Sequence, residues 1–190
     1  MFSLFSPKIA AQEVADVLIE GLQKDVGNGQ INKPFIDEAS PDDLTNIRQE
    51  WFYFDAFNVD YFVFLALGQT PEARAILDVF WRQMREWLAA SKVPALPERM
   101  GPYAGYPGSM KIIPEEHLES AYDRVRRRCA MYMETINRPH PLGENHSVGL
   151  TFGILCGDLD LPRVAGVAGF FHKRKMEWVK MLKSHRIVIP

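Results

Sequence analysis

The stretch of sequence that decides the fold spans residues 40–68 and reads SPDDLTNIRQEWFYFDAFNVDYFVFLALG. Eight of the 22 aromatic residues of the chain lie between positions 51 and 64. A helix with apolar residues on nearly all of its sides is typical of the centre of a protein. Ser40 and Pro41 are typical of a helix N-terminus, and Gly68 is typical of a helix end. We therefore predict a central, buried helix over residues 41–67.

The rest of the chain also has a mostly helical hydrophobic period. Only Ile187 to Ile189 look strand-like. We predict an all-α fold, a single-domain bundle of five to six helices over residues 1–190, with two long proline-containing loops at 94–114 and 137–146. The flanking helices are expected at 7–24, from Pro71 onward, 115–136, 147–156 and 161–184. The predicted core consists of Trp51, Phe54, Phe62, Phe80, Trp81, Met84, Tyr122 and Val125.

The composition excludes several classes of protein. With 47% hydrophobic and 24% charged residues, the chain is globular rather than disordered. A net charge of −2 gives no reason to expect nucleic acid. We expect no membrane span, because the most apolar stretch contains Asp55, Asn58 and Asp60. Cys129 and Cys156 have no metal-binding spacing, and there is no signal-peptide pattern, so we expect a cytoplasmic protein with free thiols.

The charges are divided unequally between the two halves of the chain. Residues 1–95 carry 8 basic and 14 acidic side chains, whereas residues 96–190 carry 14 basic and 10 acidic ones. Such asymmetry indicates either a polar interaction surface or acidic and basic helices that pack on one another. The last helix is rich in Lys and Arg, and its polar face is either solvated or suited to an acidic partner.

One face of the helix at 41–67 is the main candidate site. At 100° per residue, Trp51, Asp55, Asn58 and Phe62 fall on the same side. Two polar groups among aromatic rings are typical of a pocket for a small apolar or aromatic ligand. The alternative is a core ion pair of Asp55 with Arg48 or with an arginine of the helix at 115–136.

The two loops supply weaker candidates. Tyr103 and Tyr106 in the 94–114 loop are suited to lining a ligand groove, or else pack on the bundle. In the 137–146 loop, metal-capable side chains cluster at His140, Glu144 and His146. Their spacing matches no zinc or di-iron motif, so solvated side chains are the alternative, and no cofactor is expected.

Small residues recur where two helices are predicted to follow each other. Gly149, Gly153 and Gly157 are spaced by four, and small residues also occur at 165–169. Small side chains allow two helix backbones to approach closely. We predict tight helix packing there, with a narrow cavity for a flat ligand as the alternative.

These observations favour a binding protein over an enzyme. The expected function is to bind a small apolar ligand between helices, or a partner protein. One alternative is an enzyme whose site lies between the helix at 41–67 and the two loops, although no catalytic motif is present. Another is a helical scaffold subunit of an oligomer. The aromatic fraction of 12% also suggests a homodimer, because it exceeds what one bundle is expected to bury.

Overall fold

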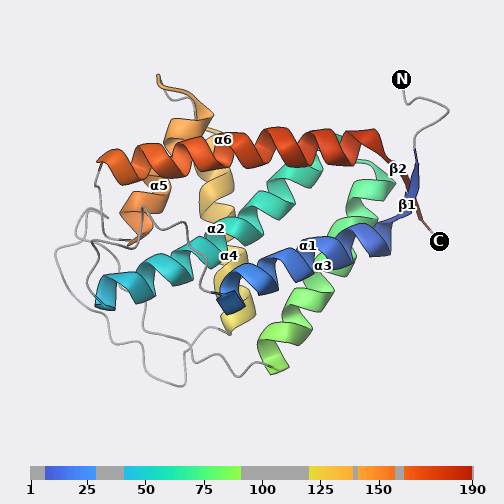
Figure 1. Ribbon diagram of the computed structural model, residues 1–190, viewed down its shortest axis with the longest axis horizontal. Helices are drawn as coiled ribbons and strands as arrows, with labels where there is room; N and C mark the ends of the chain where they lie inside the picture. The colour runs from blue at the N-terminus through green and yellow to red at the C-terminus, as the bar shows by residue number, and fades with distance from the viewer. Residues whose placement is uncertain (1–6, 29–40, 91–119, 139–140, 157–160, 190) are drawn as a thin grey trace.

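The computed structural model describes residues 7–28, 41–90, 120–138, 141–156 and 161–189. Within these ranges the fold is all-α, as predicted, with six helices and two three-residue strands (Figure 1). The helices are α1 (Ala11–Asn28), α2 (Pro41–Leu67), α3 (Pro71–Ala90), α4 (Ala121–Ile136), α5 (Glu144–Cys156) and α6 (Leu161–Ser184). The assignment of residues 1–190 to a single domain stays a prediction, because the longer connections lie outside the described residues.

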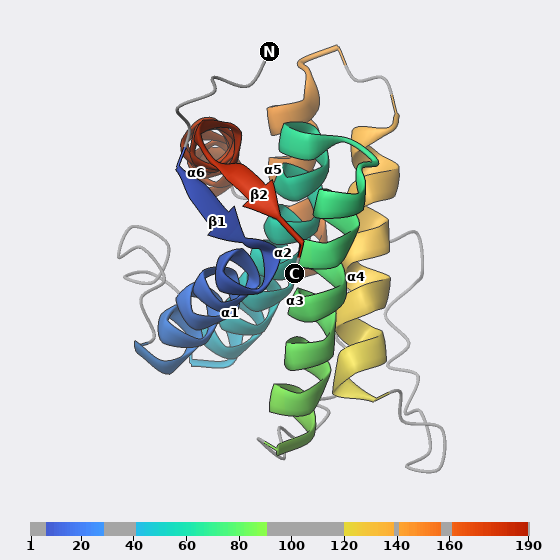
Figure 2. The ribbon, with the colours of Figure 1, turned by 90° about the vertical axis from the view of Figure 1, so that its right-hand side faces the viewer.

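Helix α2 passes through the centre of the molecule and contacts all five other helices (Figure 2). Every residue from Tyr53 to Val59 is buried, which is the environment predicted from its aromatic composition. Burying each large apolar side chain stabilises the fold by roughly 1.5–3 kcal/mol before conformational entropy is subtracted. The other helices pack around α2 because nearly all of its sides are apolar, although Arg48 and Phe64 are exposed.

The helix ends follow local chemistry. Gly68 has a φ of +67°, the left-handed conformation that ends α2, and its N–H donates to the carbonyl of Phe64 at 2.7 Å. Two residues later the hydroxyl of Thr70 accepts the N–H of Ala73 at 3.2 Å and caps α3. Ser120 caps α4 in the same way. This short turn therefore joins α2 to α3, which pack against each other.

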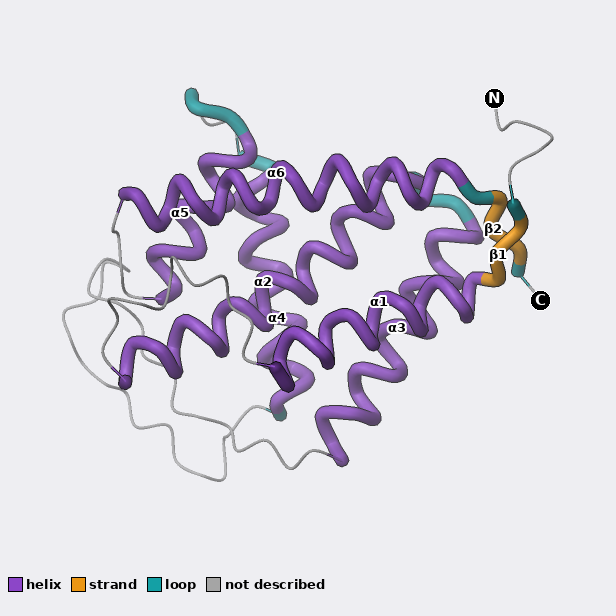
Figure 3. The backbone as a smooth tube through the Cα atoms, viewed as in Figure 1, coloured by secondary structure: helices purple, strands orange, loops and turns teal. Residues whose placement is uncertain are grey.

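The start of the chain differs from the prediction. Residues 7–10 were expected to belong to the first helix, but Lys8–Ala10 form strand β1, and α1 begins at Ala11. Strand β1 pairs in parallel with β2 (Arg186–Val188), with Ile9 opposite Ile187 (Figure 3). This pairing joins segments from opposite ends of the chain, so local periodicity contains no sign of it.

The predicted core is largely correct. Seven of the eight named residues are buried, and Tyr122 is half-buried. The guanidinium of Arg85 lies 4.5 Å above the ring of Tyr122, which explains why this ring sits at the edge of the core. Around Phe57 the rings of Tyr61, Tyr132 and Phe171 are stacked at centroid distances of 5.0–6.1 Å.

The aromatic residues whose number suggested a homodimer are mostly buried within one protomer. Among the described aromatic side chains, only Phe64 is exposed, at 43%. The aromatic fraction therefore gives no support to a dimer. The described helices also include none that is long and apolar enough to cross a membrane.

Candidate functional site

The predicted face of α2 packs against α6. The ring of Trp51 lies 4.9 Å from that of Phe170, and the ring of Phe62 lies 6.1 Å from that of Trp178. Both helices therefore increase in residue number in the same direction along the contact. Asp55 lies between the two aromatic pairs. The four residues that the sequence placed on one side are all buried at this contact or beside it.

Asp55 forms an ion pair with a residue that the sequence analysis did not name. Its Oδ1 accepts a hydrogen bond from an Nη atom of Arg174 in α6 at 2.6 Å. The guanidinium also lies 4.5 Å above the ring of Phe170 and 5.8 Å above that of Trp178. The sequence analysis expected Arg48 or an arginine of the helix at 115–136 as the partner, and the side chain of Arg48 is exposed. Since α6 covers this face of α2, this cation comes from 119 residues further along the chain.

Asn58 is the one buried side chain of this face that lacks a partner among the described residues. It is 0% exposed, and neither its Oδ1 nor its Nδ2 has a hydrogen-bond partner there. It follows Asp55 by one turn and precedes Phe62 by one turn, so it belongs to the face that α6 covers. A buried polar group left without a hydrogen bond costs about 1–3 kcal/mol. Asn58 is therefore the polar group of this face that remains open to another partner.

A second buried polar cluster lies between α2 and α4. Glu50 is 2% exposed, and the hydroxyl of Tyr132 donates to its Oε1 at 2.8 Å. An Nη of Arg128 lies 3.4 Å from its Oε2, and Arg124 is also buried one turn earlier. Burial raises the pKa of Tyr132, and the Glu50 carboxylate raises it further, so the phenol stays neutral and donates.

The sequence analysis missed this cluster, although a signal for it exists. Arg124 and Arg128 are spaced by four within the densest arginine run of the chain, so they share one face of α4. Val125 and Cys129 are buried beside them on the same helix. Buried arginines require a carboxylate, but the sequence alone does not reveal that Glu50 supplies it.

The two cysteines are free, as expected. The thiol of Cys129 donates to the carbonyl of Tyr53 at 3.9 Å. Burial raises the pKa of both Cys129 and Cys156, so both thiols are protonated at neutral pH. A protonated thiol is a poor nucleophile and a poor metal ligand, which argues against cysteine chemistry at either position.

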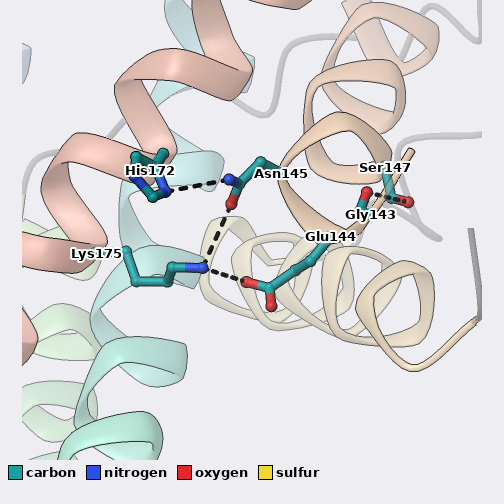
Figure 4. Close-up of polar contacts among 6 residues, drawn as sticks. All are labelled: Gly143, Glu144, Asn145, Ser147, His172 and Lys175. Atoms are coloured by element: carbon teal, nitrogen blue, oxygen red, sulfur yellow. Dashed lines mark hydrogen bonds and ion pairs between the residues drawn. The ribbon is translucent and has the colours of Figure 1, made fainter. Parts of the chain in front are cut away.

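The proposed metal candidates are used in other contacts or lie outside the described residues. Glu144 opens α5, and its Oε1 lies 3.3 Å from Nζ of Lys175 (Figure 4). Lys175 also donates to Asn145 at 3.4 Å, and Asn145 lies 3.2 Å from Nδ1 of His172. These contacts link α5 to α6. The short helix was expected to begin at Ser147, but α5 begins at Glu144. Gly143, the residue before Glu144, has a φ of +82° and turns the chain into the helix.

The loop candidates remain predictions. Tyr103, Tyr106 and the whole 94–114 loop lie outside the described residues, as does His140. His146 is half-buried within α5. Among the residues that the structure describes, no three His, Cys, Asp or Glu side chains are arranged to hold a metal ion.

The predicted close approach of small residues is found at Gly149. A Cβ atom at this position would lie 2.5 Å from the carbonyl oxygen of Val164, so α5 and α6 cross with nearly direct backbone contact. Gly169 has open space instead, which places it away from this crossing. The glycine pattern thus brings α6 against α5 and fixes which side of α6 faces outward.

The outward face of α6 carries three lysines and one glutamate. Lys173, Lys180 and Lys183 are exposed, and none of them forms an ion pair within the described residues. Met176 lies among them with 61% of its surface exposed. Glu177 is exposed one turn from both Lys173 and Lys180, so three lysines and one glutamate give this face a net charge of +2. We call Lys173, Met176, Lys180 and Lys183 the basic face of α6.

No family model, no curated protein and no solved structure matches this chain. A function must therefore be inferred from the residues of the chain itself. They offer two features, the basic face of α6 on the surface and Asn58 in the interior.

Proposed function

We propose that this chain is a helical binding protein that docks an acidic partner protein on the basic face of α6. The observation that carries the proposal is the contrast between the two sides of this helix. Arg174 and Lys175, which point inward, are paired with Asp55 and Glu144. The outward lysines form no ion pair among the described residues, and the exposed Glu177 one turn from Lys173 and Lys180 leaves the face with an excess of positive charge.

The chemistry of the face suits a protein partner. Exposed lysines attract acidic surfaces over about one Debye length and increase the rate of association. Met176 adds a flexible apolar contact that adapts to its neighbour. Charge supplies selectivity for an acidic helix, whereas the methionine supplies the buried apolar area that charges alone do not.

A pair of synthetic peptides tests this proposal. The first is a 20-residue helical peptide with two glutamates flanking one leucine on the same face, and the second has lysines in place of the glutamates. We expect fluorescence anisotropy to detect binding of the acidic peptide alone. The double variant K173E/K180E should weaken this binding by about tenfold or more.

The matched control is R74E/R82E, which reverses two exposed charges on α3 and changes the net charge by the same amount. It should leave the affinity for the acidic peptide nearly unchanged. Equal weakening by both double variants would show that net charge alone attracts the peptide. The proposal would then be wrong.

A second candidate function rests on Asn58. A fully buried amide without a partner is suited to orient a small ligand that carries one hydrogen-bonding group on an apolar body. Native mass spectrometry of the purified protein tests this idea. A bound mass present in the wild type and absent from N58L would support it, and no bound mass in either protein would contradict it.

A further inference from the structure

Helix α1 exposes a face of opposite charge to the basic face of α6. Glu13, Val17 and Glu20 are exposed, and they lie within about 60° of one another around the helix. Val17 is 56% exposed, so the face has one apolar residue between two carboxylates. Asp16 does not belong to it, because its Oδ1 is bonded to Gln12 and to Gln83 within the protomer. We call Glu13, Val17 and Glu20 the acidic face of α1.

The two faces match in spacing when the helices run antiparallel. From Glu13 the apolar residue follows after four positions and the second glutamate after three more. From Lys180, counted backwards, Met176 follows after four positions and Lys173 after three more. An antiparallel contact therefore sets one apolar pair between two pairs of opposite charge. The pairs are Glu13 with Lys180, Val17 with Met176, and Glu20 with Lys173.

We propose that the acidic partner of α6 is a second copy of this chain, which docks its α1 antiparallel on α6. This inference rests on the proposed function and names the partner. It agrees with the unequal division of charge, since the acidic face lies in the half with net charge −6 and the basic face in the half with +4, although Asp55–Arg174 and Glu50–Arg128 also pair the two halves within one protomer. It also accounts for the two largest exposed apolar side chains of these helices, Val17 and Met176, which cover each other in the contact.

The arrangement of the helices allows this contact to close as a symmetric dimer. Helices α1 and α6 lie on the same side of the molecule, with α4 on the opposite side (Figure 2). They run in opposite directions, because α1 begins and α6 ends at the small sheet (Figure 1). A two-fold axis along the space between them therefore places α1 of each protomer antiparallel on α6 of its partner. The same contact is then made twice, and no face is left over to extend a chain.

Sedimentation velocity on charge-reversed variants tests the inference. The wild type should dimerise at concentrations up to about 100 µM, and raising the salt to about 0.5 M should weaken the dimer. E13K/E20K and K173E/K180E should each be monomeric, because like charges then face one another. An equimolar mixture of the two variants should restore a dimer, since both contacts regain opposite charges.

The control R74E/R82E should dimerise like the wild type, because neither residue belongs to the two faces. A monomeric wild type across this range, or a stable E13K/E20K dimer, would overturn the inference. Polymers larger than a dimer in the mixture would overturn the two-fold closure. Binding of the acidic peptide to a monomeric wild type separates the two proposals: the basic face would then serve another acidic protein, and the proposed function would stand without this partner.

Discussion

The charged residues on the two sides of α6 have opposite environments. On the inward side, Arg174 reaches a carboxylate that is 4% exposed, and its guanidinium lies above the ring of Phe170. On the outward side, Lys173 and Lys180 remain in water without an ion pair among the described residues. A charge taken out of water must be paired if the fold is to be stable, whereas a solvated charge has no such requirement. The inward charges therefore serve the fold, and the outward charges are available for binding.

The largest effect is expected where a buried carboxylate balances a buried arginine. E50Q should lower the free energy of unfolding by about 3–5 kcal/mol, because Arg128 loses this carboxylate inside the protein. Urea unfolding followed by circular dichroism measures the change. The control is E134Q, which removes the exposed ion pair with Arg138 and should cost less than about 1 kcal/mol. Similar losses in both variants would mean that burial does not set the strength of the Glu50 contact.

A smaller loss is expected at the contact between α2 and α6. D55N should lower the free energy of unfolding by about 2 kcal/mol, because Arg174 is 21% exposed and keeps part of its hydration. D78N removes an exposed carboxylate on α3 and should change it by less than about 0.5 kcal/mol. If D55N and D78N change the free energy of unfolding equally little, the ion pair of Asp55 with Arg174 does not stabilise the fold.

The unpartnered amide should behave in the opposite way. N58L replaces a buried polar group by an apolar one of similar size, so it should raise the free energy of unfolding by about 1–3 kcal/mol. The same replacement at Asn145, which contacts Lys175 and His172, should lower it. A destabilised N58L would show that a polar partner, water or ligand, occupies the site in the purified protein.

Asp60 should give a pH-dependent effect rather than a constant one. Burial raises its pKa above the ordinary 3.8, although Arg126 and a hydrogen bond from Trp81 act against this. The folded state then binds the proton more tightly than the unfolded state, so wild-type stability falls as pH rises from 3.8 to the raised pKa. The variant D60N should lack this fall. Parallel pH profiles of unfolding for the two proteins would contradict the assignment.

The smallest effect on stability is expected on the outward side. K173E/K180E should change the free energy of unfolding by less than about 0.5 kcal/mol when measured near 1 µM, where a weak dimer is dissociated. K175E places a like charge beside Glu144 on the inward side and should cost more. A strongly destabilised K173E/K180E would mean that the basic face supports the fold itself, and the contrast between the two sides of α6 would disappear.

The sequence by itself determined the helices and the identity of the central one. Seven of the eight aromatic residues of 51–64 are buried or half-buried, as their composition favours, and Gly68 and Thr70 set the turn through local backbone chemistry. These signals act within a few residues, so they can be recognised in the sequence alone. The same is true of the shared face of Trp51, Asp55, Asn58 and Phe62, which follows from helical geometry alone.

Only the tertiary structure decided which residues meet across that face. Asp55 pairs with Arg174, Glu50 with Arg128, and β1 with β2, and each contact joins segments at least 78 residues apart. Which cation reaches a carboxylate depends on how helices cross, and that crossing is set by packing such as the close approach at Gly149. The lysines left in water on α6 are known only once this packing is known. A candidate binding surface consists of exposed residues that make no contact within the fold. Which residues these are depends on the packing of the helices and cannot be read from the sequence.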